Sequence, residues 1–126
     1  MYELRVKHDF PAAHHLEGYP GDCARPHGHN WTIEVFARSR QLDSLGLAID
    51  FRDLKRAVKG LCEPWDHQDL NGLADFKGIN PSAEQIARLS FTRLAKVVNN
   101  DQTWIDRVTI WENDRCSATY FEPAGA

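Results

Sequence analysis

Residues 29–37 read HNWTIEVFA, and the alternation of apolar and polar side chains in this run decides the fold class. Trp31, Ile33 and Val35 share one face, which is the period-two pattern of a half-buried strand. Residues 2–10, YELRVKHDF, alternate in the same way. Two such strands predict a sheet with one apolar face, and other parts of the chain must pack on that face.

Two helices are predicted in the middle of the chain. One begins near Asp50, a favourable N-cap, and continues with apolar residues at helical spacing until a proline prevents its extension. The second follows Ser82 as its N-cap, with Gln85 at the capping-box position. Two further strands are expected at residues 104–112 and 117–122, joined by a hairpin.

The order strand–strand–helix–helix–strand–strand predicts an α+β domain. Its expected architecture is a four-stranded antiparallel sheet with two helices on one face. A length of 126 residues suits one domain, so we expect a single unit over residues 1–126. Residues 11–28, rich in Gly, Pro and His, form the expected connection between the first two strands, and so long a loop is typically functional.

Composition excludes several classes of protein. Hydrophobic residues at 42% and charged residues at 26% are typical of a globular chain. A net charge of -3 argues against general binding to nucleic acid or a membrane surface, and no apolar run is long enough to span a bilayer. The charged first residues argue against a signal peptide, and three cysteines, an odd number, favour free thiols. A cytoplasmic location is therefore expected.

Six histidines are unusual in a chain of this length, and three of them form a pattern. In an extended segment, His27 and His29 point to the same side of the backbone, and Gly28 between them lets the backbone approach closely. Continuing the parity of the first strand past Phe10 brings His14 to the same face. Three imidazoles with an open fourth position are typical of a catalytic zinc site. Two hydrogen-bonded surface histidines are the alternative for the His-x-His pair alone.

Cys23 lies four residues before His27 and admits two interpretations. It could close a structural zinc site as a fourth ligand. It could instead be a catalytic thiol whose thiolate is favoured by nearby cationic groups such as Arg25. Cys62 and Cys116 have no comparable neighbours and are expected to be inert.

Asp66 and Glu112 are candidate functional carboxylates. Asp66 precedes His67, and a carboxylate beside an imidazole can hold its tautomer and tune it as a base; loop capping is the alternative. Glu112 follows Val108 and Ile110 at period two and is expected on their sheet face. A carboxylate there needs donors, such as the two adjacent N–H groups of a guanidine-like heterocycle, unless it lies at an exposed strand end.

Taken together, these motifs resemble the family of 6-pyruvoyltetrahydropterin synthases and 6-carboxytetrahydropterin synthases. The matching blocks follow the family's order over nearly the whole chain. They are Phe10-Pro11-Ala12-Ala13-His14, Cys23-Ala24-Arg25-Pro26-His27-Gly28-His29, Ile49-Asp50-Phe51 with Leu54-Lys55, Asp66-His67 with Leu70-Asn71, Asn80-Pro81-Ser82 with Glu84, and Glu112. The resemblance implies the tunnelling fold (T-fold), in which ββααββ units form trimers and two trimers form a homohexamer, with active sites between subunits.

The resemblance also implies the roles of the site residues. It implies a catalytic Zn²⁺ ion held by His14, His27 and His29. It implies three proton-transfer groups, which are Cys23, Asp66 and His67.

The implied substrate is a pterin, whose ring Glu112 would anchor. The family's Asn-Pro-Thr motif reads Asn-Pro-Ser here, and the hydroxyl of Ser82 could still form a hydrogen bond to the pterin. Arg25 is a further candidate, for contact with a triphosphate.

The spacing separates two branches of the family. Three residues lie between Cys23 and His27, which resembles the bacterial 6-carboxytetrahydropterin synthases of queuosine biosynthesis. The implied activity is that of a zinc-dependent lyase acting on 7,8-dihydroneopterin triphosphate, with release of acetaldehyde and triphosphate. The alternatives are 6-pyruvoyltetrahydropterin formation, aldolase-like cleavage of dihydroneopterin and, from another class, a non-catalytic structural zinc module.

Overall fold

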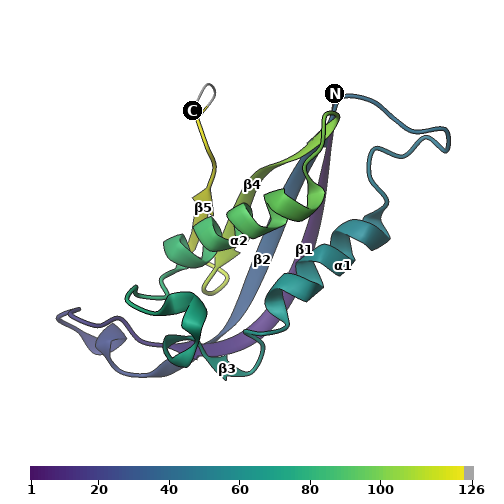
Figure 1. Cartoon of the computed structure of the whole chain (residues 1–126). Coiled ribbons are helices and arrows are strands. Elements are labelled where there is room, and N and C mark those ends of the chain that lie inside the picture. Colours follow the sequence, from purple (N-terminus) through teal and green to yellow (C-terminus); the bar gives the residue numbers. More distant parts are fainter. Residues whose placement is uncertain (124–126) are drawn as a thin grey trace.

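A computed structural model, which describes residues 1–123, shows a sheet with helices packed on one side (Figure 1). Its helices and strands are β1 (Tyr2–His14), β2 (His27–Ser39), α1 (Phe51–Cys62), β3 (Gln68–Asp69), α2 (Ala83–Val98), β4 (Thr103–Trp111) and β5 (Ser117–Tyr120). Short 3-10 turns lie at Asp22–Ala24, Leu70–Gly72 and Ala74–Phe76. The predicted order of two strands, two helices and two strands is confirmed, with β3 added between the helices.

The sheet contains the four predicted antiparallel strands and one more. The strand order is β3-β1-β2-β4-β5, and β3 pairs in parallel with β1 through Ala12↔Gln68 and Ala13↔Asp69. A two-residue strand is too short to show any alternation of apolar and polar residues, so it carries no local sequence signal. The expected purely antiparallel, four-stranded sheet is therefore corrected to a mixed, five-stranded one.

Strand β1 continues four residues beyond its predicted end at Phe10. The pairing with β2 runs without a shift from Tyr2↔Ser39 to His14↔His27 and passes through Pro11↔Asn30. Proline is tolerated in a strand where its missing N–H is not needed by the ladder. The connection between the strands is accordingly shorter than residues 11–28, and His14 faces His27 directly.

Both predicted N-caps are confirmed. The Asp50 side chain accepts a hydrogen bond from the Arg52 N–H, and the Ser82 hydroxyl accepts one from the Gln85 N–H at 3.2 Å. Both helices lie on the same face of the sheet, where Leu54 and the other apolar helix residues meet the buried faces of β1, β2 and β4 (Figure 1). Within residues 1–123, no helix combines the length and the apolar character that crossing a membrane requires.

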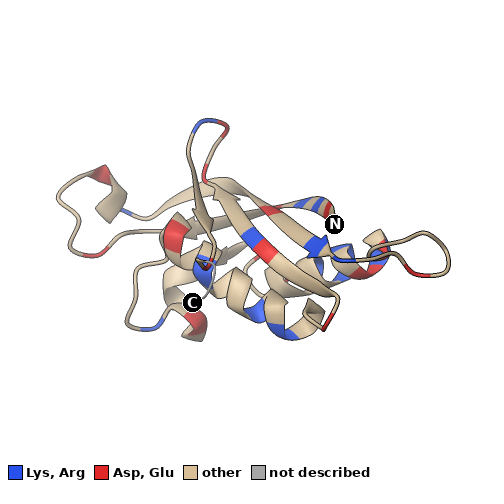
Figure 2. Cartoon of the chain, turned by 90° about the horizontal axis from the view of Figure 1, so that it is seen from above, with Lys and Arg blue, Asp and Glu red and all other residues tan. Residues whose placement is uncertain are grey.

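The other face of the sheet is polar. Figure 2 shows acidic and basic residues interspersed along the strands. Glu3 on β1 pairs with Arg38 on β2 at 3.3 Å and with Arg107 on β4 at 2.8 Å. Because these charges neutralise one another, they tie three strands together without creating a large field of one sign.

The connection between β3 and α2 is held to the core by one carboxylate. Asp75 accepts two hydrogen bonds from Arg93 on α2, at 2.9 and 2.7 Å, and one from the indole of the buried Trp65 at 2.9 Å. The Arg93 guanidinium holds the pKa of Asp75 below its ordinary value. Asp75 therefore stabilises the fold above that ordinary value and loses its contribution as the pH falls through its folded pKa.

Asp75→Asn is expected to lower the free energy of unfolding at pH 7 by about 1–2 kcal/mol, because the amide loses the ion pair and one acceptor. Denaturant titrations at neutral and acidic pH measure this difference. The gap between the variant and the parent should shrink as the pH falls through the lowered pKa of Asp75, because the parent carboxylate then takes up a proton. An equal gap at every pH would contradict the assigned role of the charge.

Candidate metal centre and active site

Three histidines meet where β1 ends and β2 begins. His14 lies directly opposite His27, and His29 lies opposite Ala12, two residues along the same face. The ring centroids are 4.5 Å apart for His14 and His27, 5.1 Å for His14 and His29, and 4.8 Å for His27 and His29. One ring nitrogen from each lies within 4.8 Å of the other two. The three imidazoles that the sequence grouped by strand parity are thus brought together.

Backbone carbonyls orient two of these rings. Nδ1 of His14 lies 2.7 Å from the Pro81 carbonyl oxygen, and Nδ1 of His27 lies 2.7 Å from that of Arg25. Because a carbonyl oxygen can only accept, both Nδ1 atoms carry the hydrogen and both Nε2 atoms keep a lone pair. Metal-binding histidines typically donate the hydrogen of their other ring nitrogen to a carbonyl in this way.

The remaining ring nitrogens lack partners in a way that fits a metal ion. Nε2 of His14 and Nε2 of His29 are buried and have no hydrogen-bond partner within residues 1–123. Burial lowers the pKa of both His14 and His29, so both imidazoles are neutral near pH 7 and able to bind a cation. Three imidazoles form a donor set that suits zinc and several other transition metals.

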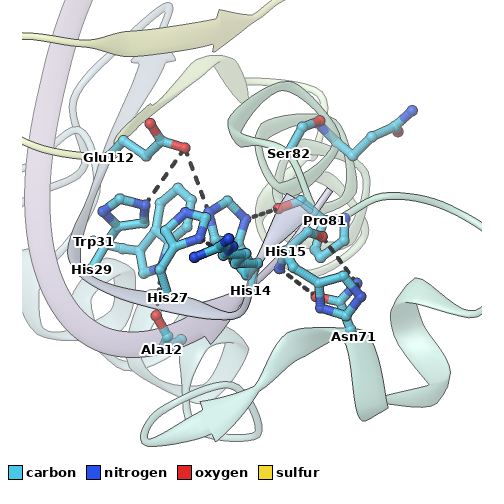
Figure 3. A network of polar contacts seen from close by, with 12 residues as sticks. Ala12, His14, His15, His27, His29, Trp31, Asn71, Pro81, Ser82 and Glu112 are labelled. Carbon is cyan, nitrogen blue, oxygen red and sulfur yellow. Dashed lines mark hydrogen bonds and ion pairs between the residues drawn. The ribbon is translucent and has the colours of Figure 1, made fainter. Parts of the chain in front are cut away.

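Glu112 faces the same point from the end of β4. Its Oε1 lies 3.7 Å from Nε2 of His14 and 3.8 Å from Nε2 of His29 (Figure 3). These distances exceed those of hydrogen bonds. A carboxylate oxygen opposite imidazole lone pairs is an arrangement that a cation between them would stabilise. With one third of its side chain exposed, Glu112 also keeps a surface from which it can reach a ligand.

The Trp31 ring packs against two of the histidines. Its ring lies edge to face with His14 at 4.9 Å and with His29 at 5.1 Å, and its N–H donates to the Ala12 carbonyl at 3.1 Å (Figure 3). The indole is fully buried, so it fixes both rings from below. The sequence placed Trp31 in the core but gave no sign that it supports the metal centre.

Cys23 lies in an exposed 3-10 turn of the loop between β1 and β2. Its thiol is not a member of the ligand group that His14, His27 and His29 form among the described residues. Arg25 is exposed and contributes its carbonyl to His27, and its side chain makes no hydrogen bond to the part of the chain that the structure describes, so the predicted triphosphate contact stays a prediction. Within residues 1–123, Cys23 therefore does not complete this ligand group, and its catalytic role remains a prediction.

The Asp66–His67 pair lies on the turn before β3. His67 Nδ1 lies 2.8 Å from Asp66 Oδ1, although the contact does not have the geometry of a hydrogen bond. The His67 N–H donates to the Pro11 carbonyl at 2.7 Å, and the side chain is 78% exposed. His67 and His29 line one cavity of about 490 Å³. Within residues 1–123, no hydrogen bond or ion pair joins Cys23 to this pair.

The surroundings of Ser82, Cys62 and Gly28 bear on the roles expected for these three residues. Ser82 uses its hydroxyl as the helix N-cap acceptor and retains its hydrogen for a further bond. Burial raises the pKa of the Cys62 thiol to about 12, which fits the inert role expected for it. Gly28 is not required for close packing within the chain, because a Cβ there would meet the Ala12 carbonyl oxygen only at 4.0 Å.

The comparisons with known proteins agree with this architecture. The family model described as 6-pyruvoyl tetrahydropterin synthase matches residues 3–123. A 6-carboxy-5,6,7,8-tetrahydropterin synthase of Synechocystis is 30% identical over 128 residues, which cover 98% of this chain and 95% of the relative. A dihydroneopterin monophosphate aldolase of Pyrococcus furiosus is 32% identical over 88 residues, which cover 70% of this chain and 71% of the relative.

The fold is shared with a solved structure as well. The 6-pyruvoyl tetrahydropterin synthase of Caenorhabditis elegans superposes with a TM-score of 0.83 at 26% identity, covering 97% of this chain and 96% of that one. The architecture is the T-fold of pterin synthases. The chain belongs to the 6-pyruvoyl tetrahydropterin synthase family.

Proposed function

We propose that the chain is a zinc-dependent 6-carboxy-5,6,7,8-tetrahydropterin synthase of queuosine biosynthesis. It would convert 7,8-dihydroneopterin triphosphate and water to 6-carboxytetrahydropterin, acetaldehyde and triphosphate. The observation that carries the proposal is the convergence of three imidazoles, two of which are oriented by backbone carbonyls. The name of the Synechocystis relative and the three-residue spacing between Cys23 and His27 favour this branch of the family.

His14, His27 and His29 would hold the zinc ion, which when bound would act as a Lewis acid toward the side-chain oxygens of the substrate. The carboxylate of Glu112 would accept hydrogen bonds from adjacent N–H groups of the pterin ring. Glu112 is partly exposed beside the histidine cluster, so a ligand could reach its carboxylate. The Ser82 hydroxyl would donate to the same ring, and Arg25 would meet the triphosphate.

Cys23, His67 and Asp66 would move protons during tautomerisation and triphosphate loss. Cys23 and His67 are both exposed, and no hydrogen bond or ion pair within residues 1–123 joins them. Their exposure agrees with an active site in which the thiol comes from one subunit and the Asp66–His67 pair from its neighbour. We accordingly include the homohexamer, a dimer of trimers, in the proposal.

Two further parts of the proposal concern the chain as a whole. Residues 1–126 would form a single T-fold unit, which agrees with the family match over residues 3–123. The three cysteines are free, two of them exposed, and free thiols suit the reducing cytoplasm. No nucleic-acid or membrane partner is proposed.

Metal analysis and product analysis test the proposal on one preparation. The purified chain should contain about one zinc ion per subunit, and incubation with 7,8-dihydroneopterin triphosphate should release acetaldehyde and 6-carboxytetrahydropterin. Chelation should stop the reaction, and added zinc should restore it. Turnover without acetaldehyde would refute the branch assignment, and full turnover by metal-free protein would refute the zinc dependence.

Aldolase activity is the second candidate, and the Pyrococcus furiosus relative, a dihydroneopterin monophosphate aldolase, is the observation that favours it. An aldolase would cleave the side chain without triphosphate release. Parallel assays with the monophosphate and the triphosphate of dihydroneopterin therefore separate the two. Formation of 6-pyruvoyltetrahydropterin, the activity in the name of the Caenorhabditis elegans enzyme, would be identified in the same product analysis.

A further inference from the structure

Residues 71–81, here called the template segment, contact the end of β1 and the start of the following loop at three points. The Pro81 carbonyl accepts from His14, Asn71 binds His15, and Asn80 binds Glu17. Figure 3 shows the first two of these contacts beside the histidine cluster. None of the proposed catalytic roles accounts for the two asparagines.

Each asparagine amide binds both backbone groups of one residue. Asn71 accepts from the His15 N–H at 2.9 Å and donates to the His15 carbonyl at 3.0 Å. Asn80 accepts from the Glu17 N–H at 2.9 Å and donates to the Glu17 carbonyl at 3.1 Å. A side-chain amide offers one acceptor and one donor side by side, as a neighbouring strand does, so each asparagine holds one residue of the loop after β1 by both of its backbone polar groups.

Leu16 lies between the two residues that are held in this way. Its N–H donates to the Cys23 carbonyl at 2.8 Å. The position of Leu16 is fixed from both sides by Asn71 and Asn80, and Leu16 in turn fixes the backbone of Cys23. One continuous series of hydrogen bonds therefore connects the template segment to the exposed thiol.

The template segment can serve this purpose because the core holds it. Phe76 within the segment and Leu70 just before it are buried, and the Phe76 ring lies 5.7 Å from that of Trp65. Asp75 joins the same segment to Arg93 on α2. The loop with Cys23 has no buried residue in its 3-10 turn, so its order depends on contacts with this firmer neighbour.

We propose that Asn71 and Asn80 are positioning residues that hold the Cys23 thiol at its working place beside the metal centre. The proposal rests on the proposed function in that it takes Cys23 to be a proton-transfer group. The asparagines do not touch the reacting atoms; they act through His15, Leu16 and Glu17.

Asn71→Asp and Asn80→Asp test this with almost no change in shape. The carboxylate still accepts from the backbone N–H, but it cannot donate and it repels the carbonyl. In zinc-loaded protein we expect kcat to fall about tenfold, the factor that a loss of about 1.4 kcal/mol gives, with KM and zinc content nearly unchanged. Asn100→Asp is the matched control, because the side chain of Asn100 is used only as an acceptor.

A second readout does not depend on turnover. Hydrogen exchange at the amides of His15, Leu16 and Glu17 should become about tenfold faster in either variant. The rate of Cys23 alkylation by iodoacetamide, divided by that of the exposed Cys116 in the same sample, should also change. If Asn71 and Asn80 only stabilised the fold, their replacement would lower the melting temperature and leave the Cys23/Cys116 alkylation ratio and kcat unaltered.

The outcomes separate the two proposals. Unchanged exchange, unchanged alkylation ratio and unchanged kcat in an active protein would overturn the positioning role. If the parent protein shows no turnover of dihydroneopterin phosphates, the proposed function fails. Exchange and alkylation then still decide whether the asparagines hold Cys23.

Discussion

Cys23→Ala is expected to reduce kcat by about 10²–10⁴-fold while leaving the zinc content of the protein unchanged, because general acid–base groups contribute rate factors of this size. The thiol is exposed and stands outside the group of three imidazoles, so its loss removes a proton-transfer group and leaves all three ring nitrogens in place. Single-turnover assays and metal analysis on the same sample measure the two quantities.

The contrary result is equally clear. If Cys23 closed a structural site, its replacement would release the metal and lower the melting temperature. Asp22→Ala is the matched control, since Asp22 is exposed in the same 3-10 turn and its side chain makes no hydrogen bond within residues 1–123. Equal losses of activity in both variants would assign the effect to the loop and not to the thiol.

His29→Ala is expected to weaken metal binding by a factor on the order of a hundred, and turnover should fall with it. Zinc sites with about four ligands bind with about 10–16 kcal/mol, so one ligand accounts for about 3 kcal/mol. His29 is a better choice than His14, because His29 is partly exposed whereas removal of the buried His14 ring would also leave a cavity.

His8→Ala provides the comparison for His29→Ala. His8 lies on β1 opposite Ile33 and belongs to no metal-binding group among residues 1–123, so the variant should keep its zinc and its activity. Equilibrium competition with a chromogenic chelator gives both affinities. Zinc binding by His29→Ala at the parental affinity would remove His29 from the ligand set.

Much of the fold could be predicted because each element carries its own local signal. The alternation in β2, the N-caps Asp50 and Ser82 and the helical spacing after them are all confirmed. Strand β3 was missed because its pairing with Ala12 and Ala13 depends on tertiary contact and not on local pattern. The end of β1 was misplaced at a proline whose nitrogen the sheet does not need.

The histidine cluster of the candidate site was predictable from the chemistry of its side chains and from the alternation of side chains between the two faces of a strand. Parity alone placed His14, His27 and His29 on one face. The carbonyls of Pro81 and Arg25 could not be predicted, because every residue has a carbonyl and the sequence does not show which one turns toward a ring. The closeness of Glu112 to two histidines likewise depends on where β4 ends against β2, which the sequence does not show.

The buried Nε2 atoms of His14 and His29 have a consequence for the lifetime of the protein. Each unsatisfied polar atom costs about 1–3 kcal/mol, which is a large part of the stability of an ordinary domain. A bound metal ion would relieve this cost, so chains made under shortage of that metal would unfold more often and meet proteases sooner. The supply of the metal would then govern how much of this protein a cell retains.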